Sequence, residues 1–163
     1  MAELFVEILG KPHGIIVFQL LAACRFTIYL SLIAFIGGGA VACLITLFRI
    51  SKNYSLQRLA ASFIWIFQSV PLLMLLFLIG LGMPRLLDIN IDPWTAATFA
   101  LVLFTSAYLA EVWRGAVESV AKGQWEASFA LNMEYSLLLR KVIIPQALKF
   151  GIAPTVGFMV QII

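Results

Sequence analysis

Stretches without a charged residue dominate the pattern of this chain. Asp, Glu, Lys and Arg are absent from residues 26–48, 59–84, 94–110 and 150–163. A helix needs about 20 predominantly apolar residues to cross the hydrocarbon core of a bilayer. The first two stretches exceed this length, the third can continue as a helix past Glu111, and the fourth is too short. The pattern predicts an all-α, polytopic transmembrane helical bundle.

We expect one transmembrane domain over residues 1–163. The predicted spans cover residues 15–48, 58–83, 93–118 and 148–163, and a loop at residues 119–147 joins the last two. The fourth span is expected to be incomplete, because the sequence stops inside it and no basic residue anchors its last turn. The sequence is therefore expected to be a C-terminally truncated fragment.

Composition and charge support a membrane protein and give it an orientation. The chain is 63% hydrophobic and only 12% charged, with a mean hydropathy of +1.03, which is untypical of a soluble domain. Lys and Arg in loops stay on the cytoplasmic side. Those that follow the first and third spans are Arg49, Lys52, Arg58, Arg114, Lys122, Arg140, Lys141 and Lys149. We therefore expect the N-terminus outside and residues 119–147 in the cytoplasm, and we attribute the net charge of +3 to this topology.

Residues with catalytic or ligand chemistry are scarce. The single histidine, His13, has no Cys, His or carboxylate partners at metal-ligand spacing, so we predict no metal site and no catalytic site. The phosphate-binding pattern GxxxxGK[ST] does not occur in the sequence. Any ATP used by this protein would be bound by a partner.

Small and polar residues interrupt the apolar spans in two places. Ala34, Gly38 and Ala42 recur every four residues, a spacing that lets another helix approach closely in lipid. In the second span, Pro71 follows Gln68 and Ser69, and it should kink that helix. A kink beside polar side chains either lines a translocation pathway or is purely structural.

Three charged residues follow the third apolar stretch. Glu111, Arg114 and Glu118 are three and four residues apart, so they share one helical face and can form ion pairs. Ionisable groups within a membrane helix are candidates for a pathway. The alternative is an interfacial salt bridge at the end of the span.

The loop at residues 119–147 carries an amphipathic pattern. Gly123 is expected to break the preceding helix, and Glu126 to stand in the first turn of a new one. Phe129 and Met133, four residues apart with Ala130 beside Phe129, are expected to form one apolar side.

The same loop is expected to turn once and continue as a second helix. Asn132 should end the first helix, because Asn readily takes the left-handed conformation. The second helix would begin at Glu134 and reach Arg140 and Lys141, and Pro145 would limit it. A helix-turn-helix of this kind either contacts a protein or rests on lipid headgroups.

The motifs in this loop resemble a known family. Gly123-Gln124, Glu126-Ala127-Ser128, Ala130-Leu131 and Ile144-Pro145-Gln146-Ala147 resemble the EAA signature of the membrane subunits of ATP-binding-cassette (ABC) importers. AYLAEVWRGAVESV at residues 107–120 and SVPLLMLLFLIGLGMP at residues 69–84 are similar to permeases for polar amino acids of the histidine, glutamine, glutamate and arginine type. The resemblance extends from about Leu20 to the end of the sequence.

The resemblance implies a function and a set of partners. It implies a permease subunit, not itself an enzyme, that moves polar amino acids across the bacterial inner membrane. The EAA segment would be a coupling helix docked on a cytoplasmic ATPase dimer, which binds the ATP and Mg. A second permease subunit, identical or paralogous, would complete the pathway, and an extracytoplasmic binding protein would deliver the amino acid.

The resemblance also implies roles for individual residues. The docking candidates are Gly123, Gln124, Glu126, Ala127, Ser128, Phe129, Ala130, Asn132, Met133, Arg140 and Pro145. The candidates for the translocation pathway are Gln68, Ser69, Pro71, Glu111 and Arg114.

Three positions depart from the family pattern. Asn132 replaces a glycine, Gln68 replaces an arginine, and Gly157 replaces an asparagine.

Two other classes of function stay open. A secondary transporter or channel would work without an ATPase, and an assembly protein would bind partners without substrate-stimulated turnover.

Overall fold

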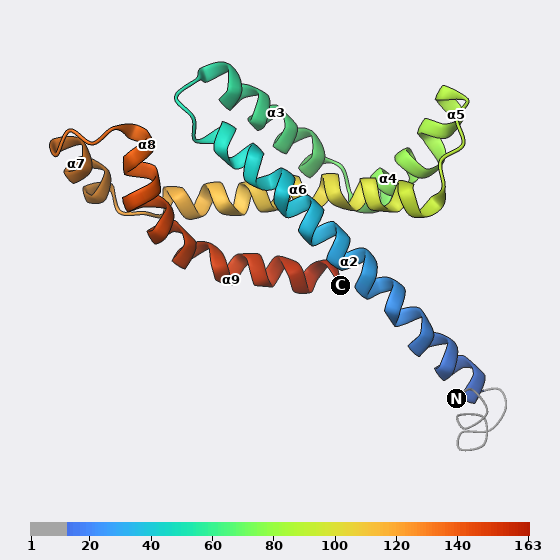
Figure 1. Cartoon of the computed structure of the whole chain (residues 1–163). Helices are drawn as coiled ribbons and strands as arrows, with labels where there is room; N and C mark the ends of the chain where they lie inside the picture. The colour runs from blue at the N-terminus through green and yellow to red at the C-terminus, as the bar shows by residue number, and fades with distance from the viewer. Residues whose placement is uncertain (1–12) are drawn as a thin grey trace.

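The structure is a computed structural model that describes residues 13–163. Within these residues all regular structure is helical, which confirms the predicted all-α class. The elements in chain order are α2 (His13–Arg49), α3 (Tyr54–Ser69), α4 (Leu72–Phe77), the π-helical turn η1 (Leu78–Gly82), α5 (Met83–Leu87), α6 (Pro93–Glu118), α7 (Lys122–Ala130), α8 (Tyr135–Leu138), the π-helical turn η2 (Leu139–Ile143) and α9 (Ile144–Ile162). Figure 1 shows α4 and α5 at one end of α6, and α7 and α8 at the other.

Helix α6 is the centre of the bundle, and α2 packs directly across it. The predicted small-residue stripe is buried at this contact, with Ala34 and Ala42 at most 1% exposed. A Cβ atom added to Gly38 would lie only 2.6 Å from the side chain of Thr105 on α6. The predicted close packing of the stripe is therefore confirmed, and its partner is α6 of the same chain.

The second apolar stretch is broken at Pro71. Helix α3 ends at Ser69, α4 begins at Leu72, and the two helices meet at 97°. The predicted kink at Pro71 is confirmed, and it is a full break, because Val70 and Pro71 both have extended ψ angles, of 123° and 140°. A residue before proline is driven out of the α conformation by the proline ring, so the helix stops instead of bending.

Two π-helical turns precede prolines. Pro84 stands near the start of α5, directly after η1, and Pro145 near the start of α9, directly after η2. Proline has no N–H, and its ring clashes with the carbonyl four residues earlier, so a widened turn is one way to keep the chain helical. The expectation that Pro145 ends a helix is therefore wrong, because α8, η2 and α9 continue as one helix, Tyr135–Ile162.

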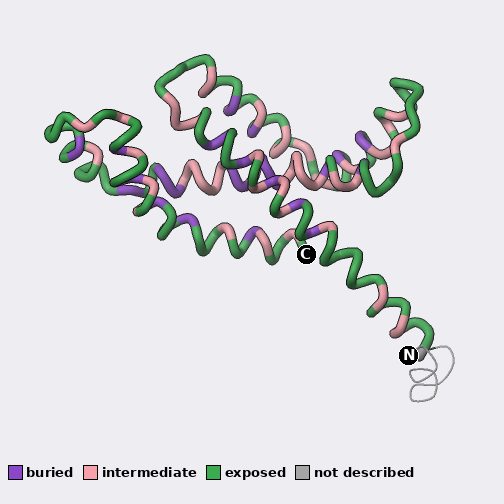
Figure 2. The backbone as a smooth tube through the Cα atoms, viewed as in Figure 1, coloured by how far each residue is buried: buried purple, intermediate pink, exposed green. Residues whose placement is uncertain are grey.

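Within residues 13–163, three helices are long and apolar enough to cross a membrane. They are Ile15–Arg49, Pro93–Glu118 and Tyr135–Ile162, and the bent pair from α3 to α5 would be a fourth if it counts as one span. The helix Tyr135–Ile162 is longer than the charge-free stretch at residues 150–163, which by itself is too short to span a bilayer. Figure 2 shows exposed residues along every helix, and many of these are large apolar residues, as in proteins that contact lipid.

Candidate functional site

The candidate site is the segment between α6 and α9. Helix α6 ends at Glu118, and Ala121 has an extended ψ angle of 134° just before α7 begins at Lys122. Gly123 is the second residue of α7, so the expectation that Gly123 breaks the helix is wrong. The break lies earlier, where Val120 is buried and holds the turn against the bundle.

Asn132 ends α7 as predicted. Its φ angle is 53°, in the left-handed region. The Asn132 N–H donates to the Phe129 carbonyl (2.9 Å), and the Met133 N–H donates to the Ser128 carbonyl (3.1 Å). This pair of hydrogen bonds is the Schellman motif, which satisfies carbonyls at the end of a helix and reverses the chain.

A compact apolar core holds the reversed segment against the bundle. We call it the second core. Its buried residues are Ala116, Val117, Val120, Leu138, Ile143 and Ala147, and Ile50, Trp125, Met133, Leu139 and Val142 pack on it. The second core joins α7 and α8 to the last turns of α6, the first turns of α9 and the end of α2. The segment is thus firmly attached to three long helices.

Met133 and Phe129 do not form one exposed apolar side, so this expectation is wrong. Met133 is half-buried against the second core, whereas Phe129 is 54% exposed. Residues four apart share a face only inside a helix, and the left-handed Asn132 stands between these two. Trp125, which sequence reasoning overlooked, supplies the inward apolar contact of α7.

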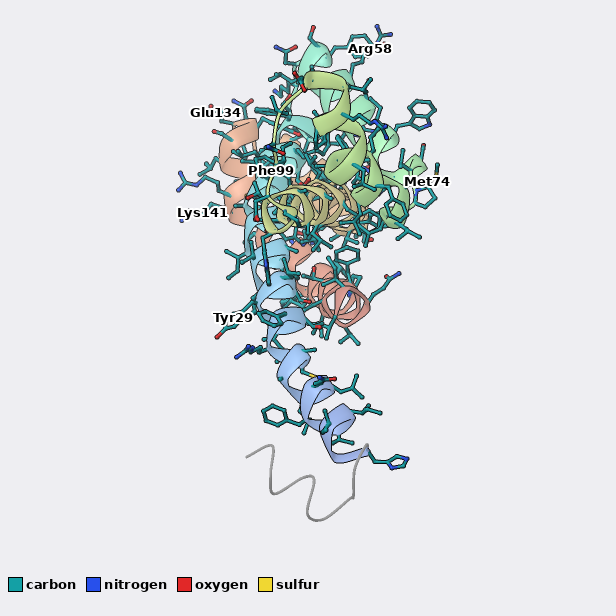
Figure 3. All side chains as sticks on the ribbon, turned by 90° about the vertical axis from the view of Figure 1, so that its right-hand side faces the viewer. Tyr29, Arg58, Met74, Phe99, Glu134 and Lys141 are labelled. Carbon is teal, nitrogen blue, oxygen red and sulfur yellow. The ribbon has the colours of Figure 1, made fainter. Side chains whose placement is uncertain are left out.

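Most of the docking candidates reach the surface. The exposed ones are Gly123, Gln124, Glu126, Ala127, Phe129, Ala130, Asn132, Arg140 and Pro145. Ser128 is buried, and its hydroxyl donates to the Gln124 carbonyl (2.7 Å). Gln146 of α9 donates to the side chain of Gln124 (3.2 Å) and to the Val142 carbonyl (2.9 Å), which ties α7 to α9. In Figure 3, the side chains of Glu134 and Lys141 point outward, away from the bundle.

Tyr135 is a functional candidate that sequence reasoning missed. Its hydroxyl donates to the Ile50 carbonyl (2.6 Å), and the Lys52 Nζ lies 4.9 Å from the centre of its ring. The partners are more than 80 positions apart in the chain. No local pattern could reveal such a contact.

The charged pathway candidates are paired with one another. Arg114 binds Glu111 through two hydrogen bonds, of 2.9 Å from Nε and 2.5 Å from Nη2, and it also forms an ion pair with Glu118. The three side chains are partly exposed at the last turns of α6. The predicted ion pairing on one helical face is therefore confirmed.

The polar candidates of the second span divide into two groups. Gln68 donates to the Ala107 carbonyl of α6 (3.3 Å), one helical turn before Glu111. Ser69 instead donates to the Trp65 carbonyl of its own helix (2.6 Å), and Pro71 is exposed at the bend. The structure thus joins Gln68 to α6 one helical turn before Glu111, whereas Ser69 bonds only within its own helix.

An apolar groove of about 460 Å³ lies between α2, α6 and α9. Its polar donors are already used. Thr46 donates to the Ala42 carbonyl (2.8 Å), Trp113 to the Thr155 hydroxyl (3.0 Å), and Thr155 to the Gly151 carbonyl (2.6 Å). A polar amino acid would lose its hydration here without replacement partners, so we do not assign it this groove.

Known proteins are similar to this chain in sequence and in the arrangement of helices. The family "Binding-protein-dependent transport system inner membrane component" matches residues 35–163. The probable amino-acid ABC transporter permease protein YckA of Bacillus subtilis (strain 168) is 33% identical and aligns with 85% of this chain and 61% of its own length. The nopaline transport system permease protein NocM of Agrobacterium fabrum is 35% identical over 89% of this chain and 64% of its own length.

A solved structure agrees with these relatives. The crystal structure of an amino acid ABC transporter with histidines matches 91% of this chain and 71% of the other chain, with a TM-score of 0.82 and 30% identity. The chain spans about three-fifths of the length of the two curated relatives. The predicted resemblance is confirmed: this chain belongs to the family of binding-protein-dependent transport system inner membrane components, together with amino-acid ABC transporter permeases.

Proposed function

We propose that this chain is a permease subunit that moves polar amino acids across the inner membrane, driven by ATP hydrolysis in a partner ATPase. The observation that carries the proposal is the surface of α7. Glu126, Ala127, Phe129 and Ala130 are exposed together on a short helix outside the apolar spans. We call these four residues the docking surface.

Phe129 would be the apolar anchor of the docking surface. An aromatic side chain that is 54% exposed gains free energy when a partner buries it, and aromatic residues are frequent among the strongest contacts of interfaces. Glu126 beside it would add a charged contact that favours a basic partner groove. The flanking Ala127 and Ala130 are small enough to let that groove approach the helix closely.

The attachment of α7 explains how docking could drive transport. The second core and the Gln124–Gln146 hydrogen bond connect α7 to α6 and α9. A helix held in this way moves with the elements on which it packs, since close-packed interiors deform little. Closure of an ATPase dimer would therefore shift α6 and α9. The pathway would then open in turn to the outside and to the cytoplasm.

We further propose that Gln68, Glu111 and Arg114 face the pathway. Gln68 of α3 bonds to the Ala107 carbonyl of α6, one helical turn before Glu111, so polar groups from two helices meet α6 at neighbouring turns. Such groups are costly in a membrane and commonly mark a substrate path. Ser69 and Pro71 would contribute through the bend between α3 and α4.

The remaining partners follow from the family. A second permease subunit, identical or paralogous, would form the other half of the pathway. An extracytoplasmic binding protein would deliver the amino acid, and the ATPase would hold ATP and Mg. The N-terminus would lie outside, with α7 and α8 in the cytoplasm, in agreement with the positions of Lys and Arg.

The test is substrate-stimulated ATP hydrolysis by the reconstituted complete complex. Glu126→Ala with Phe129→Ala should lower stimulation at least about tenfold, because alanine at an interface hot spot costs about 2 kcal/mol or more. Insertion into the membrane should be unchanged. Phe99→Ala, at an exposed aromatic on α6, is the control and should keep normal stimulation.

Normal stimulation in the double variant would show that the docking surface is assigned wrongly. Transport by the wild-type chain without any ATPase would favour a secondary transporter or channel instead. Binding of an ATPase without stimulation by any amino acid would favour an assembly protein.

A further inference from the structure

We infer that Tyr135 is a positioning residue that clamps the α7–α8 segment to the end of α2. Through this clamp, a displacement of the docking surface would reach α2 as well as α6 and α9. The inference rests on the proposed function for its consequence in transport. The clamp itself is a matter of geometry within this chain.

The first part of the clamp is a hydrogen bond to a helix end. The last carbonyls of a helix have no partner within the helix and need a donor from elsewhere. Helix α2 ends at Arg49, and the next carbonyl, that of Ile50, accepts the Tyr135 hydroxyl at 2.6 Å. Tyr135 is half-buried, so water competes less for this hydrogen bond than at an open surface.

The second part consists of the groups around that hydrogen bond. The Lys52 Nζ lies over the Tyr135 ring at 4.9 Å, within the range of a cation–π interaction. The side chain of Ile50 packs on the second core, which also contains Leu138 of α8. Tyr135 and α8 are therefore joined to Ile50 through both its backbone and its side chain.

The connection between α2 and α3 is itself held firmly. The Gln57 side chain donates to the Ser51 carbonyl (2.5 Å), and Asn53 caps α3 by accepting from the Ser55 N–H (3.0 Å). A displacement of Ile50 would therefore move both α2 and α3, because the connection between them is held by hydrogen bonds. On its other side, α2 is locked to α6 by the contact of Gly38 with Thr105.

The first experiment measures the clamp without any partner. Spin labels are placed at Lys122→Cys on α7 and Leu44→Cys on α2, both at exposed positions, after Cys24 and Cys43 are changed to alanine. Tyr135→Phe removes only the hydroxyl and should broaden the distribution of distances between the labels. Tyr54→Phe is the control, because Tyr54 is an exposed tyrosine whose ring lies against Arg58. Equal widths in Tyr135→Phe and wild type would overturn the clamp.

The second experiment measures its consequence in the reconstituted complex. Tyr135→Phe should leave the recovery of the ATPase subunit unchanged and lower substrate-stimulated hydrolysis about fivefold, the factor expected for one net hydrogen bond. Lys52→Gln, which keeps the hydrogen bond, should lower it less. Normal stimulation in Tyr135→Phe would overturn the transmission role. If the wild-type chain binds no ATPase, the proposed function fails together with that role, while the label distances still decide the clamp.

Discussion

At the scale of single residues, the reversal after α7 depends on Asn132, whose left-handed φ of 53° lets the Met133 N–H reach the Ser128 carbonyl. Asn132 was identified from sequence because its tolerance of the left-handed region is a property of the residue itself. Helical spacing predicts ion pairing among Glu111, Arg114 and Glu118, and the structure adds that Arg114 binds Glu111 through two hydrogen bonds. Tyr135 was missed because its partner, Ile50, comes from a different helix. Met133 does not share a face with Phe129, because the left-handed Asn132 ends the helix between the two residues.

The conformation of Asn132 leads to a prediction about stability. Asn132→Ala should lower the free energy of unfolding of the α7–α8 segment by about 1 kcal/mol. Position 132 has a positive φ, and alanine lacks the short polar side chain that lets Asn adopt the left-handed conformation. Asn132→Gly should be neutral or stabilising, because glycine takes this conformation without strain. Limited proteolysis of the segment measures the difference. Equal cleavage rates in the two variants would contradict the left-handed turn.

At the scale of elements, the apolar stretches located the long helices but not their breaks. The bounds of α6 agree with the predicted residues 93–118 because Asp92 caps its start, accepting from the N–H groups of Trp94 and Thr95. Pro71 and Pro145 were both recognised as interruptions. One produced a bend of 97° and the other a π-helical turn within a continuous helix. The sequence alone does not distinguish these outcomes, because the residue before each proline meets the same steric restriction, yet Val70 is extended (ψ 123°) and Ile144 stays α-helical (ψ −44°).

The contact between α2 and α6 leads to a prediction about packing. Gly38→Ala should destabilise the bundle by about 1 to 3 kcal/mol, because the new methyl group would lie 2.6 Å from Thr105 and the helices would have to separate. Gly115→Ala is the matched control, since no atom lies within 4 Å of its added Cβ. The measurement is the fraction of each variant that stays monodisperse in detergent after heating. A Gly38→Ala protein as stable as the Gly115→Ala protein would contradict the close packing.

At the scale of the whole molecule, an apolar bundle carries one polar segment that is rigidly attached to it. Helices α2, α6 and α9 meet the second core at the end of the molecule where α7 and α8 lie (Figure 1). A surface helix with so many attachments is suited to receive a force and pass it into the spans. The motifs of the sequence pointed to this segment, but only the structure shows the three attachments.

The most direct test of this account is the recovery of an ATPase subunit with the chain. The chain is purified from membranes by a tag at its N-terminus, and co-purified proteins are identified and quantified by mass spectrometry. We predict that an ATP-binding-cassette ATPase is recovered with the wild-type chain and is lost when Glu126 and Phe129 are both changed to alanine. Recovery of the same amount of ATPase with the double variant, or of none with the wild-type chain, would contradict the assignment of α7 as the docking helix.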